Sequence, residues 1–144
     1  MTPLAIDMLK RMLREGSSVR VVVKGHSMRP FLRTGDVVEL RPLSHPARRG
    51  DVLAVSLGGQ IALHRVVRVA GTGAGRQVFL RGDGHQHEHG PHGEDDIVGA
   101  LGGVCRDGRR IAPLRLLLND RASRALSVAR NARNEIRRRL ARKG

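Results

Sequence analysis

The sequence is poor in cysteine and in aromatic residues, and it contains no long hydrophobic run. Cys105 is the only cysteine among 144 residues, so no disulfide can form within the chain. Apart from histidine, the aromatic side chains are Phe31 and Phe79, too few to give a row of rings on which nucleic-acid bases could stack. No stretch reaches 18 apolar residues, so the sequence predicts no membrane-spanning helix. These absences argue against a disulfide scaffold, a dedicated single-strand binder and an integral membrane protein.

Acidic residues are also scarce, and the resulting positive charge is unevenly distributed. The net charge is +14; residues 106–144 contribute +10 of it, from 13 basic and 3 acidic side chains, which leaves +4 for residues 1–105. Charged residues such as Asp7 and Lys10 interrupt the apolar residues near the N-terminus, which therefore lacks the apolar core of a signal peptide. We expect a cytoplasmic protein that could lie peripheral to a membrane through its basic end.

Hydrophobic patterning divides the chain into three predicted segments. Apolar residues at spacings of three and four predict a short amphipathic helix within residues 1–16, ending at Gly16. Residues 17–112 carry β-branched runs separated by glycine and proline, which predicts a β domain. Residues 113–144 return to helical spacing and form a basic amphipathic tail.

The strands expected in the β domain follow from its Val- and Ile-rich runs. Gly58-Gly59 separates two of these runs and is typical of a hairpin turn. The predicted strands cover residues 19–24, 36–41, 51–57, 60–69, 77–81 and 97–104.

Two of these runs present the parts of a nucleophilic site. Ser27 lies in a turn that follows the first predicted strand, where its hydroxyl can stand clear of the backbone. His64 lies within the strand predicted for residues 60–69. A serine needs a general base within hydrogen-bond reach before it becomes a useful nucleophile, and histidine is the usual one. The two residues therefore indicate an enzyme.

Five short segments, taken in order, resemble the signal-peptidase and LexA-like serine peptidase clan. The segments lie within residues 17–105, and each of them alone would be a weak signal. They are Gly25-His26-Ser27-Met28-Arg29-Pro30 with Gly35-Asp36, Gly50-Asp51-Val52-Leu53, His64-Arg65-Val66-Val67, Arg81-Gly82-Asp83, and Ile97-Val98-Gly99. The first resembles the nucleophile box of the clan and the third resembles its general-base box.

The resemblance implies a mainly β fold, a small, curled, mixed-sheet, barrel-like peptidase domain with a short N-terminal helix and a basic C-terminal helix. It also implies a soluble serine endopeptidase that cleaves a leader or signal-like segment from a peptide or precursor protein through an acyl-enzyme. No lysine lies between Lys24 and Lys143, so His64 occupies the general-base position. The chain thus resembles the Ser/His branch, that of endoplasmic-reticulum and archaeal-type signal peptidases, without a membrane anchor or a DNA-binding domain.

The Ser/His branch also implies a catalytic aspartate beside Ser27 and His64. Asp83 is the first candidate, and Asp95 and Asp96 remain as alternatives. Four histidines occur between residues 85 and 92, and they fit a metal site, adventitious metal binding or a solvated loop beside the active site. Their alternating spacing matches no common closed zinc site, so we expect no metal and no cofactor.

A second class of function remains open from the sequence. In that alternative the chain is a non-catalytic binding module of the same fold, and the Arg-rich tail of residues 113–144 contacts nucleic acid or an anionic membrane. The two classes differ in what the Ser27 hydroxyl does: only the peptidase needs it.

Overall fold

A computed structural model describes residues 2–111, 129, 132–133 and 135–142. Its elements are a helix α1 (Pro3–Arg14) and eight strands, with two short 3-10 turns. The strands are β1 (Val19–Val22), β2 (Val37–Arg41), β3 (Val52–Leu57), β4 (Gln60–Ala70), β5 (Gln77–Arg81), β6 (His89–His92), β7 (Ile97–Arg106) and β8 (Arg109–Ile111), and the turns are η1 (Gly73–Gly75) and η2 (Glu94–Asp96).

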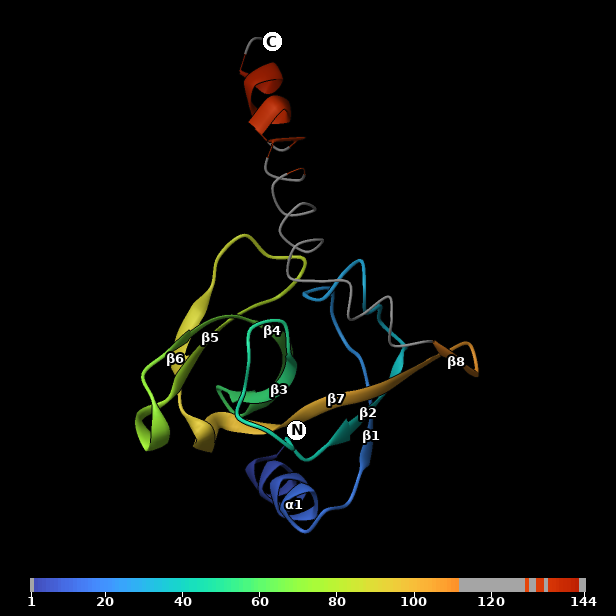
Figure 1. The fold of residues 1–144 in the computed structure, drawn as a ribbon. Helices are drawn as coiled ribbons and strands as arrows, with labels where there is room; N and C mark the ends of the chain where they lie inside the picture. The colour runs from blue at the N-terminus through green and yellow to red at the C-terminus, as the bar shows by residue number, and fades with distance from the viewer. Residues whose placement is uncertain (1, 112–128, 130–131, 134, 143–144) are drawn as a thin grey trace.

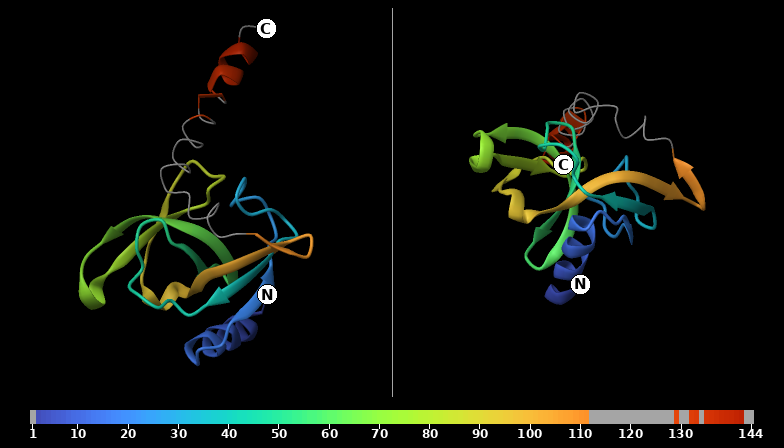
Figure 2. Two further views of the ribbon diagram at one scale, coloured as in Figure 1. Left: turned by 45° about the vertical axis from the view of Figure 1, so that its right-hand side comes forward. Right: turned by 60° about the horizontal axis from the view of Figure 1, so that its bottom comes forward.

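The strands form one curled sheet, with the order β1-β2-β7-β3-β4-β5-β6 and with β8 paired to the end of β7 (Figure 1). All of its strand pairings are antiparallel. The two views of Figure 2 show the sheet bending round on itself with α1 lying along one side. The predicted mainly β, barrel-like fold with a short N-terminal helix is therefore confirmed, although the sheet is antiparallel rather than mixed.

Six strands match the predicted runs, and the β3–β4 hairpin turns where the paired glycines predicted it. Gly58 and Gly59 both have positive φ, at 54° and 78°, which is the conformation that a two-residue type I′ turn requires. Strands β6 and β8 were not predicted; Gly90-Pro91 interrupts β6, and β8 has only three residues. Proline cannot donate to a strand ladder, and β6 tolerates it because it lies at the edge of the sheet.

Helix α1 packs on the sheet through a narrower face than the sequence pattern suggested. Thr2 caps its start by accepting from the N–H of Ala5, and its buried side chains are Ile6, Leu9 and Leu13. The other half of the apolar pattern faces outward, with Leu4 78% and Met8 64% exposed. A helix of 12 residues gains most of its stability from such packing.

The interior of the curled sheet holds two groups of aliphatic side chains. The larger group joins α1 to β2, β7 and the segment that follows β1; it includes Leu13, Met28 and Leu40. The smaller group lies between β3, β4 and β5, around Leu53, Val66 and Leu80. Because strands of both groups carry the functional candidates, this packing fixes their relative positions.

The basic tail lies mostly outside the described residues. Its described part, residues 129, 132–133 and 135–142, is largely helical, and the Ile136 and Leu140 side chains are exposed. Arg139 donates to Glu135 one turn away. The division of the chain at residues 16 and 112, and the contact of the tail with nucleic acid or membrane, stay predictions. Among the described residues no helix combines the length and the apolar character needed to cross a bilayer.

Candidate active site

Ser27 lies in a loop whose two ends are held together by backbone hydrogen bonds. The N–H of Val23 donates to the carbonyl of Asp36 at 2.8 Å, and the N–H of Gly35 donates back to the carbonyl of Val23 at 2.9 Å. Gly35 has a φ of 92°, which only glycine adopts without strain. The chain therefore leaves β1, makes the loop of residues 24–35 and returns into β2, with Ser27 partly exposed on it.

The carboxylate of Asp36 stabilises the base of this loop. It is 2% exposed, and it accepts from the N–H of Arg33 and from the guanidinium of Arg106, each at 2.8 Å. The hydrogen bond from Arg106 lowers the pKa of Asp36 below its usual value, against the opposing effect of burial. The Gly-Asp pair that the sequence associates with the nucleophile box thus serves to close the loop.

A second segment, residues 82–84, lies directly against Ser27. The N–H of Gly84 donates to the carbonyl of Ser27 at 2.7 Å. A Cβ on Gly82 would lie 2.5 Å from that carbonyl oxygen and 3.1 Å from Ser27 Cβ, so only glycine fits there. The same position is 3.1 Å from His85 Nδ1. Gly82 therefore allows the Ser27 loop and the His85 ring to approach each other.

Strand pairing brings His64 to the same segment. The pairing of β4 with β5 ends at Arg65 and Arg81, and His64 and Gly82 are the residues that follow on the two chains. Ser27 and His64 therefore both lie close to residues 82–85. The His64 ring also makes an edge contact with the His85 ring, with centroids 5.7 Å apart.

His64 is buried, and it bonds to another histidine. It is 6% exposed, and its Nδ1 lies 2.6 Å from Nε2 of His89 in β6. Burial, followed by the neighbouring His89 and His85 rings, lowers the pKa of His64 to about 4, although the Asp83 carboxylate opposes the shift. At neutral pH the ring is uncharged, which is the state that a general base requires.

The carboxylate of Asp83, the first candidate for a third catalytic residue, is bound to Arg65. Its two oxygens accept from Nε and Nη2 of Arg65 at 2.8 Å each. Both side chains are almost fully buried, at 1% and 0% exposure. Arg65 also donates to the carbonyl of Gly50. Arg65 of β4 therefore connects the segment 82–84, through Asp83, with the turn before β3.

The alternative aspartates lie apart from Asp83, in η2. Asp96 Oδ2 is 3.5 Å from Nδ1 of His92, and the backbone carbonyl of Asp95 accepts from Lys10 of α1. His92 in turn contacts His89, which contacts His64. Asp96 therefore connects to His64 through two intervening histidines. His89 and His92 are not among the residues predicted for the site; the histidine alternation of residues 85–89 was the one signal that could have pointed to them.

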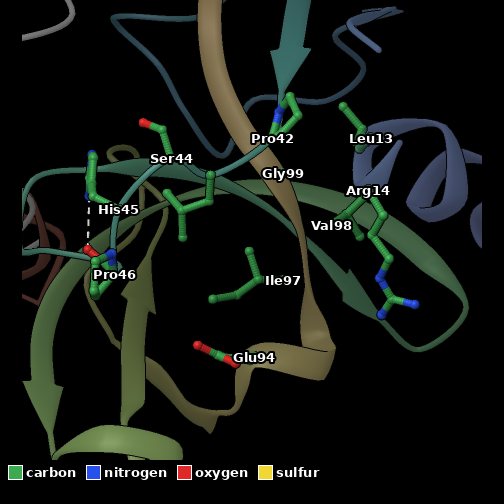
Figure 3. A pocket seen from close by; sticks show the side chains of 11 residues that line it. Leu13, Arg14, Pro42, Ser44, His45, Pro46, Glu94, Ile97, Val98 and Gly99 are labelled. Carbon is green, nitrogen blue, oxygen red and sulfur yellow. Dashed lines mark hydrogen bonds between the residues drawn. The ribbon is translucent and has the colours of Figure 1, made fainter. Parts of the chain in front are cut away.

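A described pocket lies away from Ser27 and His64. A pocket of about 520 Å³ opens between the end of α1, the segment after β2 and the start of β7, as Figure 3 shows. Leu13, His45, Glu94 and Ile97 are among its lining residues, whereas Ser27 and His64 are not. We assign it no catalytic role. Within the described residues, no group of three or more His, Cys, Asp or Glu side chains has the arrangement of a metal site.

Comparison with known families gives one match. The family model described as Peptidase S24-like matches residues 3–98, which are 96 of the 144 residues. The chain belongs to the peptidase S24-like family. A search of curated proteins finds no match to it. Membership supports a serine-peptidase type of chemistry and a protein or peptide as the substrate of this peptidase S24-like chain. The match includes the Ser27 loop, His64 and the segment 82–84.

Proposed function

We propose that the protein is a serine endopeptidase in which Ser27 is the nucleophile and His64 is the general base. The observation that carries this proposal is that both residues lie against residues 82–85: the Ser27 backbone contacts Gly82 and Gly84, and the His64 ring contacts the His85 ring. The low pKa of His64 keeps its ring neutral at physiological pH, which is the protonation state that a general base requires.

In the proposed reaction Ser27 Oγ attacks a peptide carbonyl carbon while its proton passes to His64. The imidazolium then gives that proton to the leaving amine, and a water molecule hydrolyses the acyl-enzyme by the same route. Backbone N–H groups at Ser27 and Met28 are the candidates for stabilising the oxyanion, at about 3–4 kcal/mol for each donor. The substrate class that we propose is a precursor protein with a leader or signal-like segment.

Substitution of Ser27 tests the proposal directly. The full chain and its Ser27→Ala variant are incubated with candidate precursor peptides, and the products are identified by mass spectrometry. We expect a defined cleavage by the wild-type protein and its loss in Ser27→Ala. Ser18→Ala is the matched control, because Ser18 is an exposed serine directly before β1 and lies outside the Ser27 loop. Identical processing by wild type and Ser27→Ala would refute the peptidase and favour the binding module.

The cytoplasmic location remains a prediction, as does the role of Asp83 as third catalytic residue. Asp83 acts on His64 through its charge, since it opposes the lowering of the His64 pKa. Its oxygens, however, accept from Arg65. The described hydrogen-bond partner of the His64 ring is His89 of β6.

A further inference from the structure

Three histidines and an aspartate form a continuous row that ends at the proposed general base. His64 Nδ1 lies 2.6 Å from His89 Nε2, and His89 Nδ1 lies 2.7 Å from His92 Nε2. His92 Nδ1 then lies 3.5 Å from Asp96 Oδ2. His89 and His92 are partly buried because β6 pairs with β5, opposite Leu80 and Val78. The row is therefore held by the sheet.

The direction of the two histidine–histidine hydrogen bonds follows from the charge of the Asp96 carboxylate at the end of the row. An ionised carboxylate repels a lone pair and attracts an N–H, so the 3.5 Å contact with Asp96 favours the His92 tautomer that carries its proton on Nδ1. A neutral imidazole with a proton on Nδ1 accepts at Nε2, so His92 accepts from Nδ1–H of His89. The same reasoning makes His89 accept from Nδ1–H of His64. The opposite direction would turn an unprotonated nitrogen of His92 toward the carboxylate.

This direction has a consequence for His64. With its proton on Nδ1, the His64 ring has a lone pair on Nε2, the nitrogen that is not bonded to His89. That lone pair is what the proposed reaction needs to accept the Ser27 proton. In a serine triad an aspartate gives the histidine this tautomer. Both carboxylate oxygens of Asp83 accept hydrogen bonds from Arg65 at 2.8 Å, whereas His89 contacts Nδ1 of His64.

We propose that His89 is the positioning residue of the catalytic site: it accepts the Nδ1–H of His64 and so leaves Nε2 free for the Ser27 proton, while His92 and Asp96 fix the orientation of His89. The proposal rests on the function proposed above. During attack, the Oγ–carbon bond forms, the carbonyl electron pair moves to oxygen, and the proton moves from Oγ to Nε2. The Nδ1 proton stays on His64 throughout.

A neutral His89 at Nδ1 of His64 should also determine the pH range over which the enzyme is active. The groups that face His64 are His89 and His92 of β6 together with Asp83 and His85 of the segment after β5. Of these, Asp83 alone favours the protonated ring. Burial, then His92 and His85, lower the pKa of His89 as well, which favours the neutral form of both the His64 and the His89 ring. We expect activity to persist into mildly acidic solution.

The tautomer is measured by nitrogen-15 NMR of the histidine rings in the full chain. We expect His64 to carry its proton on Nδ1 in the wild-type protein. In His89→Ala the ring should shift toward the Nε2–H form that imidazole prefers in water. The control is His87→Ala, which removes an exposed histidine two residues away and should leave the His64 signals unchanged. A wild-type Nε2–H tautomer, or an unchanged tautomer in His89→Ala, would overturn the proposal.

Kinetics supply the second measurement. His89→Ala should lower kcat by about 10²-fold with little change in KM, because it removes an orienting contact and leaves the substrate surface intact. In His89→Glu a carboxylate of similar reach replaces Nε2 opposite His64 Nδ1, so the acidic limb of the pH–rate profile should move up by about 1–3 pH units. An unmoved acidic limb in a folded His89→Glu variant would overturn the proposal. Because NMR needs no turnover, failure of the peptidase itself would show separately, as equal processing by wild type and Ser27→Ala.

Discussion

Replacing Asp83 by asparagine should destabilise the protein far more than the same kind of change at an exposed carboxylate whose ion pair has a similar distance. The Asp83 and Arg65 side chains are 0% and 1% exposed, and two hydrogen bonds of 2.8 Å join them. Asparagine keeps the volume but removes the carboxylate charge that faces the Arg65 guanidinium in the interior. Breaking a buried pair in this way costs about 3–5 kcal/mol. That is a large part of the roughly 5–15 kcal/mol that stabilises an ordinary domain.

The matched control is Glu88→Gln, which breaks the ion pair between Glu88 and Arg68. That pair has a similar distance, 2.7 Å, but its side chains are 42% and 53% exposed. Exposed pairs contribute about 0–1 kcal/mol. The two variants therefore separate the effect of burial from that of distance.

Urea unfolding followed by far-UV circular dichroism is the appropriate assay, because the chain has no tryptophan or tyrosine to report by fluorescence. The double variant Arg65→Met/Asp83→Asn removes both charges, so it should be less destabilised than the sum of the two single variants. The reasoning is refuted if Asp83→Asn costs less than about 1 kcal/mol. If such a stable variant had also lost activity, Asp83 would regain the catalytic role predicted from the sequence.

Two further predictions concern His64 and Gly82. The folded-state pKa of His64, about 4, lies below the usual 6.5, so the unfolded chain binds more protons between these values. The free energy of unfolding should therefore fall by about 3 kcal/mol as the pH drops from 6.5 to 4. Urea unfolding across this range should show a smaller fall in His64→Gln, and an equal fall in both proteins would contradict the lowered pKa of His64. Gly82→Ala should displace Ser27, because its Cβ would lie 2.5 Å from the Ser27 carbonyl oxygen, and the strain should cost about 1–3 kcal/mol and lower peptidase activity. Gly93→Ala, with open space at its Cβ, is the control for both readouts, and equal behaviour of the two alanine variants would contradict the contact.

Much of the fold could be predicted from local sequence, because its signals act over a few residues. β-branched runs predicted six strands, and paired glycines predicted the β3–β4 turn. The same reasoning missed β6, whose Gly90-Pro91 is typical of a loop. That strand exists because β5 offers it an edge, and edge pairing is a property of the assembled sheet. The outward face of α1 has the same cause: only the position of the sheet decides which apolar residues it covers.

The candidate site, like the fold, could be predicted from the sequence only in part. The sequence by itself determined the residue types, a serine in a glycine-bounded turn and a histidine in a strand, together with the peptidase family that they resemble. It could not decide which partner each charged or polar side chain would take. His64 and Arg65 are adjacent, but successive strand residues point to opposite faces, so Asp83 binds Arg65 while His89, 25 residues along the chain, meets His64. Tertiary structure decided those pairings, since they depend on how β4, β5 and β6 align rather than on any local preference.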